Sequence, residues 1–277
     1  MTDILPEPAE RGTEARHTSR MRLLLADPPV ACPVPPGAQL DEAALAELYA
    51  VPQTARRWLR VNMVSTLDGA ATGSDGRSGT INTGADHVVF ELLRVLSDVL
   101  LIGSGTARIE GYSPVGQDPE LAARRAALGR DTVLPLAILT RAGRLPAPLL
   151  QAPPGVVLAI THAASPGLPA LRGALGTDHV LVAGDADIDL AAALTHLADR
   201  GLAHVLGEGG PHLLGSFLAA GLVDELDVTF SPVVVGGAHG RIVAGVAHEQ
   251  GLLPRALVEQ DGTLMGRWLR VPTAPPG

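Results

Sequence analysis

Three glycine-rich segments of the chain carry groups that could bind a phosphorylated ligand. The most informative is Gly207-Glu208-Gly209-Gly210, which follows an apolar run and precedes Pro211. Proline suits the first turn of a helix because its missing N–H would be unpaired there, so we expect a helix to begin at Pro211. Free N–H groups at a helix start attract anions, and glycine lets a ligand approach the backbone closely. The segment therefore predicts a phosphate or pyrophosphate site made of backbone amides, with an ordinary strand-to-helix turn as the alternative.

The other two segments also end strand-like runs. Gly103-Ser104-Gly105-Thr106 begins like the GxGxxG fingerprint of dinucleotide-binding proteins, but Arg108 stands where the fingerprint has its third glycine. A standard Rossmann site is therefore not predicted there. The segment 65–69 ends in hydroxyl groups and the turn Asp68-Gly69. Together the three segments supply amides, hydroxyl groups and the carboxylates of Asp68, Glu110 and Glu208.

The sequence lacks the residues that several other kinds of functional site require. All 21 cationic residues are arginine, so no lysine can clamp a phosphate or form a Schiff base. The single cysteine, Cys32, excludes an intrachain disulfide and a CxxC site, and it favours a reducing compartment. The nine histidines show no HxH or HExxH spacing, so no metal site is predicted.

The overall composition limits the kinds of binding partner that we expect. A net charge of −8 and a pI near 5.5 leave no basic stripe for nucleic acid. No apolar run reaches the roughly 18–20 residues of a membrane span. Residues 1–20 lack the apolar core of a secretory signal. We therefore expect a cytoplasmic protein that acts on a small molecule and binds neither nucleic acid nor membrane.

The elements that must position these segments alternate between strand-like and helix-like runs. The predicted strands are 59–64, 99–102, 134–139, 156–160, 180–183, 203–206 and 226–230. Helical spacing of apolar residues marks 86–96, 190–197 and 213–218. This alternation favours a parallel sheet covered by helices on both faces, whose ligands bind at the carboxyl ends of the strands. Residues 255–259 and 264–271 flank an Asp-Gly turn and predict a closing antiparallel hairpin.

The chain divides into three predicted parts. Residues 1–20 are expected to be a disordered tail, and 58–272 a single folded domain. Between them, residues 21–57 form an N-terminal segment with a proline-rich stretch at 28–36 and a short helix at 41–49.

Four motifs in order resemble the RibD C-terminal reductase family. They are VNMVSTLDG, LLR, GSGTxRxEGY, and EGGPHLLGSFLAAGLVDEL followed by SPVVVGG, and they span roughly residues 58–271. The resemblance implies a three-layer, dihydrofolate-reductase-like α/β fold with a mostly parallel central sheet and a C-terminal antiparallel hairpin. It also implies NADPH as hydride donor, a homodimer, and a role in riboflavin biosynthesis. There the ribosyl group of a pyrimidine, such as 5-amino-6-ribosylaminouracil phosphate, is reduced to a ribityl group.

The motifs and the resemblance together assign the site residues. The cofactor-binding residues are expected to be Val64, Thr80, Gly103, Gly105, Thr106, Glu110, Thr140, Arg141, Gly209, Gly210, Pro211, His212, Leu213 and Leu214. The substrate-binding residues are expected to be Asn62, Asp68, Ser78, Arg94 and Glu208, with Glu208 also the catalytic residue. Arg141, with Arg144 close by, favours NADPH over NADH because a guanidinium can bind a 2′-phosphate through paired hydrogen bonds.

Two positions depart from the family pattern. Asn62 stands where lysine is common, and Gln117 where a phosphate-binding arginine is usual, which weakens the prediction of a substrate 5′-phosphate. The chain also lacks the HxE and PCxxC motifs of the zinc deaminase that accompanies many such reductases, so we expect a stand-alone reductase-type domain. Two alternatives stay open: an NADPH-dependent reductase of dihydrofolate or another small heterocycle, and a nucleotide-binding paralogue without turnover.

Overall fold

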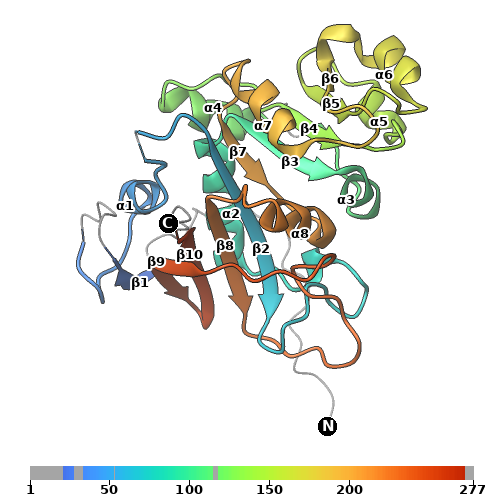
Figure 1. Cartoon of the computed structure of the whole chain (residues 1–277). Coiled ribbons are helices and arrows are strands. Elements are labelled where there is room, and N and C mark those ends of the chain that lie inside the picture. The colour runs from blue at the N-terminus through green and yellow to red at the C-terminus, as the bar shows by residue number, and fades with distance from the viewer. Residues whose placement is uncertain (1–20, 28–33, 53, 115–117, 272–277) are drawn as a thin grey trace, which may run out of the picture.

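A computed structural model describes residues 21–27, 34–52, 54–114 and 118–271 (Figure 1). The predictions made for residues 1–20, Cys32 and Gln117 lie outside these described residues, as does most of the stretch 28–36. The described residues form strands and helices around one large sheet.

Ten strands form this sheet in the order β1-β9-β10-β8-β2-β7-β3-β4-β5-β6. Their bounds are β1 Arg22–Ala26, β2 Trp58–Thr66, β3 Val99–Gly103, β4 Leu136–Leu139, β5 Val157–Thr161, β6 Val180–Val182, β7 His204–Gly207, β8 Glu225–Ser231, β9 Leu252–Gln260 and β10 Thr263–Arg270. The strands from β8 to β6 in this order run parallel, whereas β1, β9 and β10 are antiparallel to their neighbours. The predicted mostly parallel sheet with a C-terminal hairpin is therefore confirmed.

Helices cover both faces of the sheet, which gives three layers (Figure 1). The helices are α1 Glu42–Leu48, α2 Gly84–Leu96, α3 Ser104–Ile109, α4 Pro119–Ala127, α5 Ala147–Leu150, α6 Leu168–Leu175, α7 Leu190–Ala198 and α8 Pro211–Ala219. In β3, Leu100 and Ile102 pack in one apolar cluster with α1, α2 and α4, whereas Leu101 packs in another with α7 and α8. This burial on both faces explains why the parallel strands read as unbroken apolar runs.

The N-terminal segment adds an edge strand that the sequence analysis did not predict. β1 pairs antiparallel with β9, with Arg22 opposite Glu259. Its sequence RLLLA shows no alternation, because Leu23 is buried while Leu24 and Leu25 are exposed. Its partner lies more than 200 residues away, so no local pattern marked it as a strand.

A buried group of four ionisable side chains, which we call the ionic cluster, fastens α1 to the sheet. Its members, Arg60, Glu225, Asp227 and Arg267, are each at most 3% exposed. Glu225 accepts hydrogen bonds from Arg60 Nε at 2.7 Å and Arg267 Nε at 2.9 Å. The two guanidinium groups also donate to backbone carbonyls at the end of α1, among them that of Tyr49. The cluster therefore stops the carbonyls at this helix end from being buried without partners.

Burial and neighbouring charges move the pKa values of the two carboxyl groups in opposite directions. Burial alone would raise the pKa of Glu225, but Arg60 and Arg267 outweigh it and hold that pKa below its ordinary value. Burial, followed by the negative charge of Glu225, raises the pKa of Asp227 well above the usual range. Glu225 is therefore the anion of the cluster, and Asp227 is held toward its neutral form.

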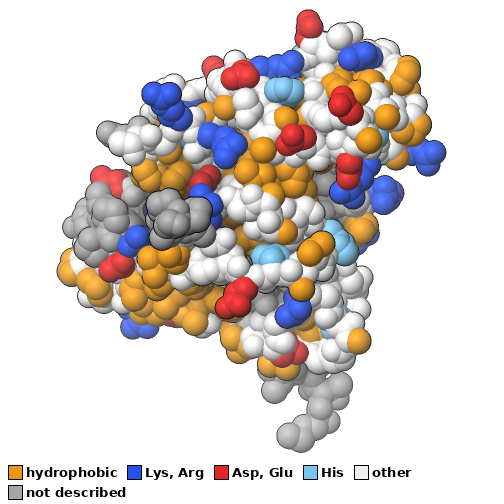
Figure 2. All heavy atoms as spheres, in the orientation of Figure 1, with side chains coloured by type: hydrophobic (Ala, Val, Ile, Leu, Met, Phe, Trp, Pro, Cys, Tyr) orange, Lys and Arg blue, Asp and Glu red, His pale blue; other side chains and the backbone are white. Residues whose placement is uncertain are grey.

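One side of the antiparallel end of the sheet carries half-buried apolar side chains, which we call the open sheet face. It consists of Phe230, Leu257, Leu264 and Trp268. Leu264 lies opposite Phe230 in the register, and the ring of Phe230 meets that of Trp268 edge-on at 6.1 Å between centroids. Hydrophobic side chains gather on the surface over this region (Figure 2). Such a contiguous apolar surface is typical of an interaction site.

Candidate functional site

The carboxyl ends of β2, β7 and β3 bring the three predicted segments together, because β7 lies between β2 and β3. A Cβ atom on Gly210, which follows β7, would lie 2.6 Å from Thr106 Oγ1 at the start of α3. A Cβ atom on Gly209 would lie 3.5 Å from Met63 Sδ of β2. A side chain at position 210 would therefore force the Thr106 hydroxyl or the turn to move.

The backbone amides at the start of α8, where the sequence predicts an anion site, differ in whether they have an acceptor within the fold. Glu208 N–H donates to Leu101 O, and Leu213 N–H donates to Gly210 O, so these two amides are used within the fold. Among the described residues, no acceptor meets the N–H groups of Gly209, Gly210 and His212. Three open amides at the start of a nine-residue helix are suited to bind an anion.

The buried Glu208 and the half-buried Arg94 and Tyr112 form a cluster beside these amides, which we call the glutamate clamp. Arg94 Nε donates to Glu208 Oε1 at 2.7 Å, and Arg94 Nη2 donates to Oε2 at 2.8 Å. The hydroxyl of Tyr112 donates to the same Oε2 at 2.8 Å. The side chain of Glu208 is only 2% exposed. The carboxylate accepts all three hydrogen bonds, and these bonds hold its two oxygens in one position.

The charge of Glu208 shifts the pKa values of both partners. Burial, followed by the carboxylate, raises the pKa of Tyr112 well above its usual value, so the phenol stays neutral. Burial would lower the pKa of Arg94, but Glu208 outweighs it and raises that pKa. The sequence analysis predicted Arg94 and Glu208 but missed Tyr112. Tyr112 belongs to the EGY motif, but nothing in the motif indicates that its hydroxyl reaches a residue 96 positions away.

Two further predicted residues, Ser78 and Glu110, meet next to α3. The hydroxyl of Ser78 donates to Glu110 Oε1 at 3.3 Å, which joins the loop before α2 to the end of α3. Thr80 lies in the same loop but is exposed, and its hydroxyl donates to Asp75 at 2.8 Å. Ser78 and Glu110 were predicted for different ligands, and the structure brings them into direct contact.

The predicted substrate residue Asp68 is used by the fold itself. Its carboxylate accepts hydrogen bonds from the hydroxyl of Thr66 and from the amides of Val235 and Gly236, which follow β8. The Thr66 hydrogen bond, followed by that of Gly236, lowers the pKa of Asp68 to about 2. Asp68 therefore ties the turn after β2 to the loop after β8.

The remaining predicted residues lie along the same sheet edge. In β2, Asn62 is 8% exposed and Val64 is half-buried, and among the described residues no hydrogen bond engages the amide of Asn62. Thr140 follows β4, where its hydroxyl accepts the N–H of Arg144 at 3.0 Å. Arg141 is exposed and donates from Nε to Asp187 at 2.7 Å. A ligand that contacts both Gly210 and Arg141 would extend across the ends of β7, β3 and β4.

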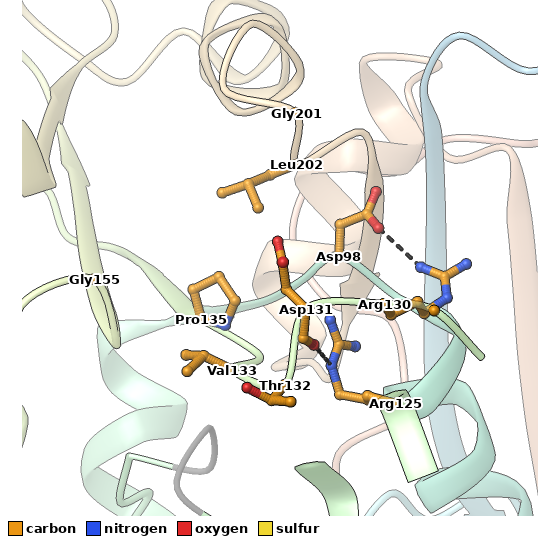
Figure 3. A pocket seen from close by; sticks show the side chains of 11 residues that line it. Asp98, Arg125, Arg130, Asp131, Thr132, Val133, Pro135, Gly155, Gly201 and Leu202 are labelled. Atoms are coloured by element: carbon orange, nitrogen blue, oxygen red, sulfur yellow. Dashed lines mark hydrogen bonds and ion pairs between the residues drawn. The ribbon is translucent and has the colours of Figure 1, made fainter. Parts of the chain in front are cut away.

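A cavity of about 550 Å³ lies at the opposite edge of the sheet (Figure 3). Asp98, which lines it, directly precedes β3, and Pro135 directly precedes β4. Arg130 Nη1 donates to Asp98 there at 2.9 Å. None of the predicted site residues lines this cavity. It is therefore separate from the candidate site at the carboxyl edge.

In the described ranges, no group of three or more histidine, cysteine or acidic residues could hold a metal ion. No helix in the part of the chain that the structure describes is long and apolar enough to cross a membrane.

Sequence comparisons identify the family of the chain. The sequence model of the RibD C-terminal domain matches residues 57–262. A 2,5-diamino-6-ribosylamino-4(3H)-pyrimidinone 5′-phosphate reductase from Methanothermobacter thermautotrophicus is 31% identical over 194 residues, which are 67% of this chain and 82% of the relative. The reductase of the same name from Archaeoglobus fulgidus is 25% identical over 66% of this chain and 83% of the relative. The riboflavin biosynthesis protein RibD of Mycobacterium tuberculosis is 26% identical, and the chain spans about half of its length.

Solved structures share the fold. A pyrimidine reductase-like protein from Corynebacterium diphtheriae superposes with a TM-score of 0.71 at 24% identity, over 83% of this chain and 99% of that one. RibD from Acinetobacter baumannii superposes with a TM-score of 0.59 at 20% identity, over 78% of this chain and 58% of that one. The chain belongs to the RibD C-terminal domain family and is homologous to the pyrimidine reductases of riboflavin biosynthesis.

Proposed function

We propose that the chain is an NADPH-dependent reductase that converts the ribosyl group of a pyrimidine to a ribityl group, with 5-amino-6-ribosylaminouracil phosphate as the example. The observation that carries the proposal is the set of open amides of Gly209, Gly210 and His212. They lie at the carboxyl edge of a parallel sheet, where such folds bind nucleotides. Homology to pyrimidine reductases supports the substrate class.

The residues at this edge fit a dinucleotide cofactor. The three open amides suit a pyrophosphate, and the absence of a side chain at Gly210 leaves the hydroxyl of Thr106 beside them. Arg141 keeps N–H groups beyond the one bonded to Asp187, and these suit a 2′-phosphate. When bound, NADPH supplies the hydride. The protein's part is then to hold cofactor and substrate at the right distance and orientation, which explains why no strong acid–base pair is needed.

The glutamate clamp lies where the heterocycle would bind. Glu208 accepts an N–H of the pyrimidine, and Arg94 holds the carboxylate in place through two charge-assisted hydrogen bonds. Asn62 and Ser78 supply polar groups on the neighbouring elements. Among the described residues of this edge, Arg77, Arg108 and Arg241 are exposed cations, so a substrate phosphate would lie toward the protein surface.

The test is a pair of assays with the purified protein. Oxidation of NADPH is followed by its absorbance, first with 5-amino-6-ribosylaminouracil phosphate and then with dihydrofolate. We expect turnover with the ribosylaminopyrimidine only. Turnover with dihydrofolate alone, or tight NADPH binding without oxidation in either assay, would contradict the proposal.

The amide site has its own test in Gly210→Ala. The new Cβ would clash with Thr106 Oγ1, so we expect NADPH to bind at least about tenfold more weakly, a cost of about 1.4 kcal/mol. The matched control is Gly173→Ala in α6, where no heavy atom lies within 4 Å of the added Cβ. Unchanged NADPH affinity in Gly210→Ala would remove this turn from the cofactor site.

We also infer that the protein is a cytoplasmic homodimer. The dimer is implied by the family, and the open sheet face offers an apolar surface for a second copy. A C2 dimer would place the same face of both copies together, which buries Trp268 and Leu257 on each side. The cytoplasm is inferred from the single cysteine and from the reducing cofactor that the proposed reaction needs.

A further inference from the structure

A buried arginine lines the cavity at the edge of the sheet opposite the candidate site. Arg125 is only 2% exposed, and its Nε donates to the backbone carbonyl of Asp131 at 2.7 Å. Its Nη1 donates to the carbonyls of Arg94 and Ser97 at the end of α2. Among the described residues, its hydrogen-bond acceptors are therefore all neutral carbonyl groups. A buried charge is costly without an opposite charge beside it, so this guanidinium is suited to pair with an anion.

Both arginines that line the cavity keep donors open. Nη2 of Arg125 has no acceptor among the described residues, and neither do Nε and Nη2 of Arg130. Burial, followed by the positive charge of Arg130, lowers the pKa of Arg125, and Asp98 and Asp131 offset only part of this effect. An anion bound by both guanidinium groups would reduce their repulsion and fill the open donors.

Two carboxylates also line the cavity, and neither outweighs these cations. Asp98 Oδ1 accepts from Arg130 Nη1 at 2.9 Å, and Oδ2 accepts from the backbone N–H of His204 at 2.8 Å, so its charge is already paired. Asp131 is exposed, so water screens its carboxylate. Arg125 is buried, where charges act on each other through a much lower dielectric. An anion beside Arg125 is therefore attracted more strongly than Asp131 repels it.

Apolar side chains form another part of the cavity wall. Val133, Pro135 and Leu202 line the cavity together with the charged groups (Figure 3). Its volume of about 550 Å³ lies in the range of small-molecule sites, about 300–1,000 Å³. This is more room than one carboxylate or phosphate group fills, so the rest of a ligand would be an organic body that packs on the apolar wall.

We propose that this cavity is a second binding site, which takes a small organic anion with a carboxylate or phosphate group on an apolar body. The anionic group binds to the open N–H groups of Arg125 and Arg130, and the body packs on Val133, Pro135 and Leu202. None of the predicted site residues lines the cavity, so this inference goes beyond the proposed function and does not depend on it.

Calorimetric titration of the wild-type protein with four simple probes tests the ligand class. Benzoate and phenyl phosphate carry the two anionic groups on the same apolar ring. Benzamide has the shape of benzoate without its charge, and inorganic phosphate lacks the apolar body. We expect at least one of the two aromatic anions to bind about tenfold more tightly than benzamide and inorganic phosphate. The tighter of the two identifies the anionic group that the site prefers.

Two variants then locate the bound anion. Arg130→Gln removes one of the two cations, so we expect the preferred anion to bind about tenfold more weakly. Asp131→Asn removes a negative charge but keeps the backbone carbonyl that holds Arg125, so the same anion should bind about threefold more tightly. The matched controls are Arg172→Gln and Asp178→Asn, which replace exposed residues outside the cavity and should leave the affinity unchanged.

The opposite signs of the two effects keep the inference testable. If Arg130→Gln does not fold, Asp131→Asn decides alone, because a damaged site weakens binding and does not tighten it. Unchanged affinity in both variants would place the anion elsewhere, for example on the open amides of α8, and would overturn the inference. Benzamide binding as tightly as both aromatic anions would overturn it as well. The titrations involve no NADPH oxidation, so the proposed function can fail or hold independently.

Discussion

Glu208 and Asp68 are both carboxylates at the ends of parallel strands, yet their surroundings give them different roles. Glu208 is buried between an arginine and a tyrosine and keeps one acceptor position open. Asp68 lies in an exposed turn, and its oxygens are taken by a hydroxyl and two backbone amides of its own fold. In the sequence both are acidic residues next to a glycine after a strand, so only their partners in the structure distinguish the proposed ligand contact from the structural group.

The lowered pKa of Asp68 predicts an acid-sensitive contribution to stability. Because its folded pKa is about 2 and its ordinary pKa 3.8, this contribution is fully present above pH 3.8 and is lost as the pH falls through about 2. We expect Asp68→Asn to be less stable than the wild type at neutral pH, with the two converging near pH 2. Urea unfolding across this range measures it, with the exposed Asp178→Asn as control. A difference that persists at pH 2 would contradict the role of the carboxylate charge.

Arg141 gives a prediction about cofactor choice. If its guanidinium binds the 2′-phosphate, Arg141→Ala should weaken NADPH binding about tenfold and leave NADH binding unchanged. Calorimetric titration with both cofactors measures the two affinities. Arg172→Ala, an exposed arginine of α6, is the control. An equal loss of affinity for both cofactors would show that Arg141 does not read the phosphate.

The sequence motifs could predict which residues gather at this edge, but not how they pair. The sequence EGGP predicted a helix start and therefore free backbone amides, because proline and glycine affect the backbone conformation at their own positions. The bond from Tyr112 to Glu208 depends on the angle at which α3 leaves β3, and that angle is set by packing between distant segments. The use of Asp68 by Val235 and Gly236 is likewise a contact between distant loops.

At the scale of elements, the ionic cluster decides how α1 is attached. Glu225 is the anion that pairs with both Arg60 and Arg267, so Glu225→Gln should leave two buried cations without it and cost about 3–5 kcal/mol of unfolding free energy. Asp227 is the matched control, because its raised pKa already favours the neutral form. We expect Asp227→Asn to change stability by less than about 1 kcal/mol.

Denaturant unfolding of both variants tests this assignment. The far-ultraviolet spectrum of each folded variant checks that α1 and the sheet remain. Equal losses of stability in the two variants would mean that Glu225 and Asp227 share the negative charge.

Elements with a strong local signal could be predicted from the sequence, and those that depend on distant pairing could not. The apolar runs gave the parallel strands, and Asp261-Gly262 gave the hairpin, where both residues adopt the positive φ that a two-residue turn requires. β1 carries no such signal, since its register is imposed by β9. The short helices α5 and α6 contain proline near their starts; α6 packs on β5 and β6, and α5 packs on α6, so their order depends on elements elsewhere in the fold.

At the scale of the whole molecule, the open sheet face predicts the oligomeric state. Leu257→Glu puts a charge at the centre of this face, so we expect it to weaken dimerisation at least about tenfold while the monomer stays folded. Sedimentation equilibrium measures the dimer constant. Leu128→Glu is the control, because Leu128 is an exposed leucine beyond the end of α4. A wild-type protein that is monomeric at micromolar concentration would contradict the inferred dimer.

The properties of the whole molecule differ in how well they can be predicted from the sequence. The fold class and the family follow from several motifs in order, since most of these motifs mark the end of a strand and helix-like runs lie between them. The substrate does not follow in the same way, because it depends on the contacts around Glu208, and these contacts join residues that are far apart in the sequence.

The length of the two outermost strands of the sheet affects how the protein behaves in concentrated solution. The outermost strand at one rim, β6, has three residues, and at the other rim β1 has five. Such short rims expose few unpaired N–H and C=O groups, so a strand from another molecule finds little backbone to extend. A large sheet that ends in this way is protected against stacking rim to rim into fibrils.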